Sequence, residues 1–320
     1  MDGRLRMKRF VSVGECMVEL APDGARWQIG IAGDTFNTAW YMRALLPAAW
    51  SVSYLTSLGA DPFSLRALDV MRDNGIATDL VQRHPSRSIG LYAIALQDGE
   101  RSFSYWRDTS AARTLADDPD LLEAAFRTAD VIYTSGVTLA ILPSEGRARL
   151  IAALTAARMR GAITVFDPNF RPRLWPNPLV AAEVITQAAE AATFVLPSFD
   201  DEAPLFGDAA PEATVRRYAD GGAETVVVKN GDRGLMLFDR GKIWPVSGLV
   251  RVVPQDTTGA GDSFNAGFLS ALLDGADVAT AAQAGHTIAS RVVCHPGALI
   301  PMQHLRGSMF ATQLGHERLP

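Results

Sequence analysis

One short stretch of the chain combines glycines and a carboxylate in a way that suits phosphate chemistry. Residues 256–266 read Asp-Thr-Thr-Gly-Ala-Gly-Asp-Ser-Phe-Asn-Ala. The sequence predicts a strand over 249–253, a glycine turn, and a helix over 263–273. Gly259 and Gly261 let the backbone approach a ligand closely, and the unpaired N–H groups at a helix start attract anions.

Asp262 is the second chemical feature of this stretch, because its carboxylate lies beside a predicted anion site. Such a group is useful if it takes a proton from a hydroxyl as a phosphate arrives. Alternatively, Asp262 only caps the helix, since Asp is a good N-cap. No Gly-Lys-[Ser/Thr] follows, which excludes a Walker A loop. Phe264 stands where a dinucleotide-binding fingerprint needs its third glycine.

The stretch resembles the C-terminal signature of the PfkB, or ribokinase-like, family of sugar kinases. The resemblance implies that the amides of Gly259, Ala260 and Gly261 form the anion hole for the transferred phosphoryl group. It also implies that Asp262 is the catalytic base. In that family the reaction uses ATP with Mg²⁺, and a monovalent cation is a further possible cofactor.

The elements that must position these residues follow from the hydrophobic pattern. From residue 130 onward, short apolar runs without alternation are separated by helix-period stretches. That pattern is typical of a parallel sheet covered on both faces. Runs over 89–96 and 101–107 are joined by Gln-Asp-Gly-Glu and predict a β-hairpin. A hairpin within a βα rhythm should belong to a separate small sheet, which could cover a site as a lid.

The expected fold class is therefore α/β. The resemblance specifies a ribokinase-like three-layer α/β/α arrangement with a mostly parallel central sheet and a small β-sheet lid. It implies a single domain over residues 1–320, with the lid formed by segments at about 11–34 and 88–107.

Candidate substrate residues begin at Gly33-Asp34-Thr35-Phe36-Asn37, where Asp34 or Thr35 could cap a helix over 36–46. The motif resembles the family's Gly-Gly-Asp, with Ala32 in place of the first glycine. The resemblance implies substrate contacts at Gly33, Asp34 and Asn37. The alternative for Asp34 is a cap alone.

Two arginines could bind a carboxylate. Arg107 ends the predicted hairpin, and Arg171 follows the strand over 163–167, where open α/β sheets bind ligands. Tyr92 and Tyr105 are further substrate candidates, although they could be ordinary strand packing, and Arg107 could be a solvated edge residue. The two arginines resemble those of the sugar-acid kinases within the family; fructokinases share the run over 167–175.

The nucleotide side is predicted around the strand end and glycine turn over 229–235. Alternatives are an N-cap role for Ser198 and simple packing for His286. A water-mediated contact to Mg²⁺ is conceivable for Glu202, but no metal ligand is assigned. The resemblance implies nucleotide contacts at Asn169, Ser198, Lys229, Gly231, Gly234, Gly259, Gly261 and His286.

Composition bounds the remaining possibilities. The 320 residues carry 30 basic and 35 acidic side chains, for a net charge of −5, which gives no electrostatic case for nucleic acid or an anionic membrane. The only cysteines, Cys16 and Cys294, form no metal or disulfide pattern. With no signal peptide or membrane-length run, we expect a cytoplasmic protein. An edge strand of the lid suggests a homo-oligomer.

The expected function is ATP-dependent phosphorylation of 2-dehydro-3-deoxygluconate at its 6-hydroxyl. Alternatives are a fructokinase or another sugar kinase of the PfkB family, and a sugar-acid-binding sensor that has lost catalysis. An intact Asp262 argues against the sensor. The missing third glycine disfavours a nucleotide-dependent dehydrogenase.

Overall fold

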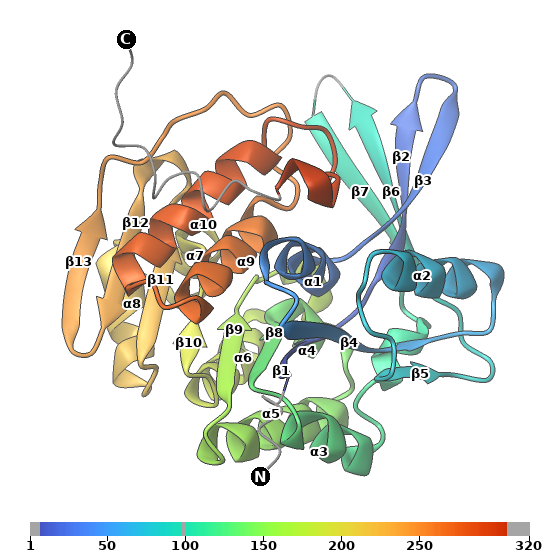
Figure 1. Ribbon diagram of the computed structural model, residues 1–320, viewed down its shortest axis with the longest axis horizontal. Coiled ribbons are helices and arrows are strands. Elements are labelled where there is room, and N and C mark those ends of the chain that lie inside the picture. The colour runs from blue at the N-terminus through green and yellow to red at the C-terminus, as the bar shows by residue number, and fades with distance from the viewer. Residues whose placement is uncertain (1–6, 98–99, 306–320) are drawn as a thin grey trace.

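The computed structural model describes residues 7–97 and 100–305, which form two sheets and the helices that cover the larger one (Figure 1). Within these residues the large sheet has nine strands in the order β13-β12-β11-β10-β9-β8-β1-β4-β5. Its strands are β1 (Lys8–Val13), β4 (Trp50–Leu58), β5 (Val81–Arg83), β8 (Val131–Ser135), β9 (Ile163–Asp167), β10 (Phe194–Val195), β11 (Thr225–Lys229), β12 (Leu235–Asp239) and β13 (Lys242–Val246). All neighbours are parallel except β11–β12 and β12–β13.

The helices between these strands cover both faces of the large sheet. The α-helices are α1 (Asp34–Leu45), α2 (Pro62–Asp73), α3 (Pro119–Arg127), α4 (Gly136–Ile141), α5 (Ser144–Met159), α6 (Pro178–Glu190), α7 (Phe199–Phe206), α8 (Pro211–Asp220), α9 (Ala260–Leu273) and α10 (Val278–Val292). Short 3₁₀ turns are η1 (Ala111–Thr114), η2 (Pro172–Leu174), η3 (Gly231–Arg233) and η4 (Met302–His304).

Both faces of the large sheet are buried, as the apolar strands predicted. In β1, Phe10 belongs to the core beneath α1, α2, α9 and α10, whereas Val11 and Val13 belong to the core beneath α3, α4, α5, α6 and α8. Successive side chains of a strand point to opposite faces, so one strand contributes to both cores. The three-layer α/β/α fold predicted from the sequence is confirmed.

The small sheet is built from two hairpins that interrupt the βα order. Its strands are β2 (Met17–Asp23), β3 (Arg26–Ala32), β6 (Gly90–Gln97) and β7 (Glu100–Trp106), in the order β3-β2-β6-β7. In Figure 1 it projects from the body of the molecule beside α1. The predicted 89–107 hairpin is present, although its turn residues Asp98 and Gly99 lie outside the described residues. That this sheet closes as a lid stays a prediction.

Two expectations about the glycine-rich stretch change. The strand predicted over 249–253 is absent: the chain leaves the sheet at the end of β13, and Val253 is 91% exposed. An apolar β-branched run with no neighbouring strand has no ladder of hydrogen bonds to join. The predicted helix begins three residues early, at Ala260, so the glycine turn itself becomes the helix N-terminus.

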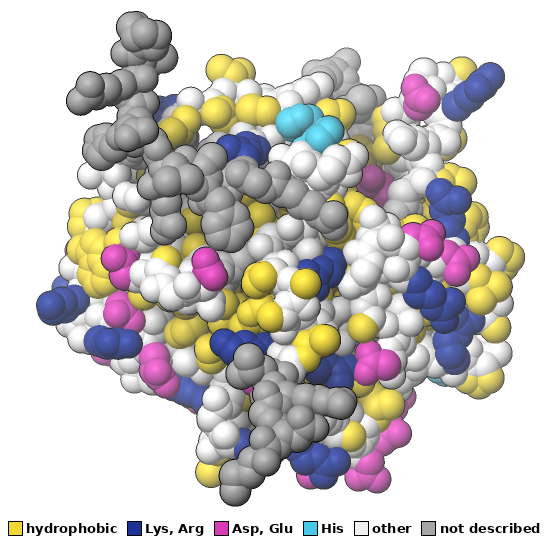
Figure 2. Space-filling view, in the orientation of Figure 1, with side chains coloured by type: hydrophobic (Ala, Val, Ile, Leu, Met, Phe, Trp, Pro, Cys, Tyr) yellow, Lys and Arg dark blue, Asp and Glu magenta, His cyan; other side chains and the backbone are white. Residues whose placement is uncertain are grey.

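Within residues 7–97 and 100–305, no helix is sufficiently long and apolar to span a membrane. On the face in Figure 2, basic and acidic side chains are interspersed rather than gathered into a single-sign field.

Candidate active site

The candidate residues collect at the carboxyl ends of the parallel strands, where open α/β sheets bind ligands. Glu15 follows β1, Asp167 ends β9 and Asn169 follows it, and Lys229 ends β11. The N-terminus of α9 reaches the same edge, because Asp167 and Lys229 both bond to Asn265 of that helix.

The glycine turn is held in a conformation that only glycine takes easily. Gly259 is the N-cap of α9 with φ of 75°, and a Cβ on it would lie 2.6 Å from the carbonyl oxygen of Ala298. Asp256 braces the turn by accepting hydrogen bonds from the N–H groups of Thr258 and Gly297. Gly261 differs, because a Cβ there would meet only Lys229 Nζ, at 3.7 Å. The fold therefore leaves room for a side chain at Gly261, whereas it leaves none at Gly259.

Asp262 lies in the first turn of α9 and is 9% exposed. Its side chain does not cap the helix, since the cap position is Gly259. Instead, its Oδ2 accepts a 2.8 Å hydrogen bond from Asn37 Nδ2. Thr38 Oγ1 approaches the Asp262 carbonyl oxygen at 3.4 Å, so two adjacent residues of α1 contact the start of α9.

The surroundings of Asp262 raise its pKa to about 8. Burial is the largest cause, and the negative charges of Asp34 and then Asp167 raise the pKa further. The hydrogen bond from Asn37 and the positive charge of Lys229 lower it. A general base works best when its pKa lies near the operating pH. Asp262 therefore has the position and the proton affinity of a base for a hydroxyl.

A buried polar cluster underlies the glycine turn. Lys229 Nζ donates to Asp167 Oδ2 at 3.0 Å and to Asn265 Oδ1 at 3.1 Å, and Asn265 Nδ2 donates to Asp167 Oδ2 at 2.7 Å and to Tyr133 at 3.0 Å. The cluster fixes a cation close to Gly261, where it favours an arriving anion. Of this cluster only Lys229 was a predicted site residue, because Asp167 and Asn265 are 62 and 36 residues away from it in the chain.

The predicted sugar-binding residues on α1 are joined to β9. Gly33, rather than Asp34 or Thr35, is the N-cap of α1, and it makes no side-chain cap bond. Asp34 Oδ2 accepts a 2.9 Å hydrogen bond from Asn169 Nδ2. Asn169 takes a left-handed φ of 34°, and its backbone N–H donates to Asp167 Oδ1 at 3.1 Å. Asn169, predicted on the nucleotide side, thus contacts the substrate side.

The lid candidates occupy two environments. Tyr92 is buried and donates a hydrogen bond to Glu19, and its ring lies 5.9 Å from that of Tyr105, which is 48% exposed. Arg107 is no solvated edge residue: it is 6% exposed, and its Nε donates to Glu15 Oε2 at 2.8 Å while Nη2 donates to the same oxygen. Glu15 was not singled out from the sequence, because nothing local marks it.

Two charged candidates remain, Arg171 and Glu202. Arg171 bonds to a residue of α7, and Glu202 is itself part of α7. Arg171, with its side chain 51% exposed, donates to Asp201 Oδ1 at 3.1 Å. Glu202, the conceivable magnesium contact, is fully buried and accepts from Arg217 Nη2 at 2.8 Å and Tyr218 OH at 2.7 Å. Those partners belong to α8, so the structure does not bring Glu202 to the site. The described residues contain no cluster of three or more metal-type ligands.

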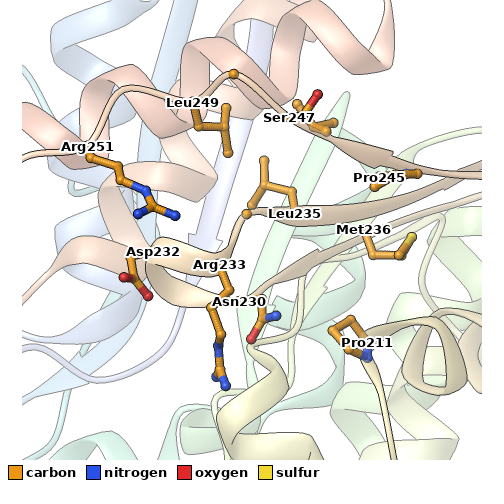
Figure 3. Close-up of a pocket in the computed structure, with 13 residues that line it drawn as sticks. Pro211, Asn230, Asp232, Arg233, Leu235, Met236, Pro245, Ser247, Leu249 and Arg251 are labelled. Carbon is orange, nitrogen blue, oxygen red and sulfur yellow. The ribbon is translucent and has the colours of Figure 1, made fainter.

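A cavity of about 330 Å³ adjoins the predicted nucleotide residues (Figure 3). Asn230 and Gly234 line it, and Asn230 Oδ1 is buried without a hydrogen-bond partner in the described part of the chain. Arg251 and Asp232 stand together on one side of the view. Such a pocket, with an unused acceptor and charged side chains at its rim, can accept a polar ring and its phosphate tail.

Three further nucleotide candidates lie at the edges of this region. Ser198 is the N-cap of α7 but makes no side-chain cap bond, so its hydroxyl is available. Gly231 opens η3 at the end of β11. His286 lies on α10, where Nε2 is 2.6 Å from the carbonyl oxygen of Val250, and it thereby tethers the segment that follows β13. His286 itself does not line the cavity.

Comparisons with known proteins show the family to which the chain belongs. Residues 7–305 match the pfkB family of carbohydrate kinases. The chain is 38% identical over 303 residues to the 2-dehydro-3-deoxygluconokinase of Dickeya dadantii, covering 92% of this chain and 98% of that one. It is 30% identical over 262 residues to fructokinase-2 of Zea mays, covering 79% and 77%. The crystal structure of a PfkB protein from Polaromonas sp. JS666 superimposes with a TM-score of 0.81 at 28% identity, covering 94% of this chain and 100% of that chain.

Proposed function

Because the chain belongs to the pfkB family of carbohydrate kinases, we propose that it transfers the γ-phosphoryl group of ATP to the 6-hydroxyl of 2-dehydro-3-deoxygluconate. Support for the substrate comes from the 38% identity to a 2-dehydro-3-deoxygluconokinase over nearly the full length of both chains. The single structural observation that carries the reaction type is Asp262, a buried carboxylate placed in the first turn of α9 directly after the glycine turn.

The chemistry follows from that placement. The free oxygen of Asp262 takes the proton of the sugar hydroxyl while the hydroxyl oxygen attacks the γ-phosphorus, and the bond to the β-phosphate oxygen breaks, leaving ADP. The N–H groups of Gly259 and Gly261 would stabilise the charge that develops on the phosphoryl oxygens, whereas the N–H of Ala260, also predicted for the anion hole, donates to the Thr257 carbonyl oxygen at 3.2 Å. Lys229, held by Asp167, adds a fixed positive charge beneath the same turn.

The carboxylate of the sugar acid needs a cationic partner, and Arg107 and Arg171 are our candidates. Each already has a protein carboxylate, Glu15 and Asp201 respectively. Guanidinium carries five N–H donors in a planar fork, so one acidic partner leaves donors for a second carboxylate.

Magnesium enters this proposal as part of the substrate, MgATP. Since the described residues offer no cluster of metal ligands, the chain fits an ion held mainly by phosphate oxygens and water. When bound, the ion neutralises phosphate charge. We assign no residue to a monovalent cation. The buried Asp256 is not assigned either, because its carboxylate already accepts two backbone hydrogen bonds.

We also propose a cytoplasmic homo-oligomer. The lid sheet presents two edge strands, β3 and β7, with Trp27 53% and Trp106 61% exposed. Unpaired strand edges readily pair with another chain. Light scattering on the purified protein would give the mass directly, and a monomer at micromolar concentration would contradict the oligomer.

The function is tested by a coupled ADP-release assay with 2-dehydro-3-deoxygluconate, fructose, ribose and gluconate side by side. We expect turnover on the keto-deoxy acid, and Asp262→Asn should lower kcat by about 10²–10⁴ while ATP still binds. Preference for fructose would make the protein a fructokinase. Binding of the acid without turnover of any sugar would instead indicate a sensor.

A further inference from the structure

Asn37 lies between the start of its own helix, α1, and the carboxylate of Asp262. Its Nδ2 donates a 2.8 Å hydrogen bond to Asp262 Oδ2, and its Oδ1 accepts one from the backbone N–H of Gly33 at 3.3 Å. Asn37 is 5% exposed and Asp262 9%. Both ends of the amide are thus used within the protein.

Gly33 fixes which way this amide faces. A backbone N–H only donates, so it must meet Oδ1, and the NH₂ group of Asn37 therefore turns toward Asp262. An NH₂ group also only donates, so it favours the ionised form of the carboxylate. Among the described residues, Oδ1 of Asp262 receives no hydrogen bond. That oxygen remains for a substrate hydroxyl.

We propose that Asn37 is a positioning residue: it holds one oxygen of Asp262 and so presents the other to the hydroxyl that is phosphorylated. This inference rests on the proposed function, and it differs from the direct sugar contact that the sequence suggested for Asn37. A helical residue one turn from the substrate-binding Asp34 thereby acts on the base rather than on the sugar.

The charges around Asp262 explain why the hydrogen bond from Asn37 should affect its ionisation. Asp34 and Asp167 disfavour its ionised form, whereas Lys229 and the Asn37 amide favour it. The titratable groups that face Asp262 are Asp34 and Tyr41 on α1, Tyr92 on β6, Tyr133 on β8, Asp167 on β9 and Lys229 on β11. Without the Asn37 donor, less favourable charge opposes burial and the two carboxylates, so the base should hold its proton to higher pH.

The test compares kcat/KM against pH for the wild type, Asn37→Ala and Asn37→Ser. We expect the midpoint of the acidic limb to rise by about one to two pH units in Asn37→Ala, the equivalent of one hydrogen bond to a charged group. Asn37→Ser, which retains a short donor, should lie between the two. Thr38→Val is the matched control, because it removes a contact to the Asp262 backbone from the same helix and should leave the midpoint unchanged.

One outcome of this experiment would contradict the positioning role of Asn37. An unchanged midpoint in Asn37→Ala, with the loss confined to KM for the sugar, would make Asn37 a substrate ligand and overturn the inference. Thermal melts establish that each variant is folded. The profile uses whichever sugar the wild type phosphorylates, so a different substrate changes the proposed function only.

If the wild type phosphorylates no sugar, the proposed function fails separately. The Asp262 carboxyl is then titrated by ¹³C NMR, with its signal assigned by comparison with Asp262→Asn. A titration midpoint that does not rise in Asn37→Ala would overturn the inference, and a rise would support it.

Discussion

At the scale of single residues, we expect the ionisation of Asp262 to set how the rate depends on pH. Its pKa is raised to about 8, mainly by burial and then by Asp34, so the carboxyl is largely protonated below that pH. Only the ionised form accepts a proton, and activity should therefore rise with pH through this value. We predict that kcat/KM increases with pH with a midpoint near 8, and that the value at pH 6 is about a hundredth of the plateau.

A buffer-independent rate profile between pH 5.5 and 9.5 checks this prediction. The coupling enzymes must be shown not to limit the rate at each pH. A profile that is flat from pH 6 to 9 would mean that Asp262 is ionised throughout, or that proton removal does not limit kcat/KM.

At the scale of the element, the two glycines at the N-terminus of α9 differ: the fold requires Gly259, and we propose that the ligand requires Gly261. A Cβ at Gly261 meets only Lys229 Nζ, at 3.7 Å, whereas a Cβ at Gly259 lies 2.6 Å from Ala298 O at a φ of 75°. Gly261→Val should therefore keep a near-wild-type Tm and lose kcat, by about 10²-fold or more if one anion-hole donor is blocked. Gly259→Ala should instead destabilise the protein by at least about 1–2 kcal/mol.

Thermal melts and kcat for the two variants give this comparison. Wild-type turnover in a folded Gly261→Val would place the phosphate cradle elsewhere. Equal losses of Tm in both variants would mean that Gly261 is also structural.

The Glu15–Arg107 ion pair joins the point where the chain enters the small sheet, before β2, to the point where it leaves it, after β7. The side chains are 1% and 6% exposed, and Glu15 Oε1 has no hydrogen-bond partner in the described chain. Removing one partner leaves a buried charge, so Arg107→Ala should lower the free energy of unfolding by about 3–5 kcal/mol.

Urea denaturation of a double-mutant cycle tests the coupling. Adding Glu15→Gln to Arg107→Ala should restore part of the lost free energy, because the amide is neutral. Strictly additive losses would mean that the two side chains do not stabilise each other.

At the scale of the whole molecule, the sugar acid would be bound both by residues of the large α/β domain and by residues of the small sheet that we expect to act as a lid. Arg171 belongs to the body, is half exposed, and pairs with Asp201 at the surface, so Arg171→Ala should fold normally. We predict a loss of about one to two decades in kcat/KM on the acid, mostly through KM, with ATP affinity unchanged. Arg107→Ala should change kcat as well, because its contact would depend on lid closure.

Arg173→Ala is the matched control for Arg171, since Arg173 is exposed on the same 3₁₀ turn. A substrate analogue with a neutral group in place of the carboxylate should be insensitive to Arg171→Ala. Equal losses on acid and neutral analogues would remove Arg171 from substrate selection and leave a sugar kinase of unassigned substrate.

The sequence by itself determined the features that depend on neighbours in the chain. The glycines before Asp262 and the helix after it predicted an anion site from the sequence, because positive φ and unpaired N–H groups are properties of a few consecutive residues. Unalternating apolar strands determined the doubly covered sheet, since both faces of such a strand must be buried. The resemblance of the stretch over 256–266 to the PfkB signature predicted the family, which the match over residues 7–305 confirms.

Tertiary structure alone decided which side chains meet. Asn37 and Asp262 are 225 residues apart, and Glu15 and Arg107 are 92 apart. Their contacts depend on the packing of α1 against α9 and on the insertion of the small sheet after β1. Tertiary structure also decided the conformation of residues 249–253. Their β propensity is high, but they pair with no strand of the described chain and form no strand themselves.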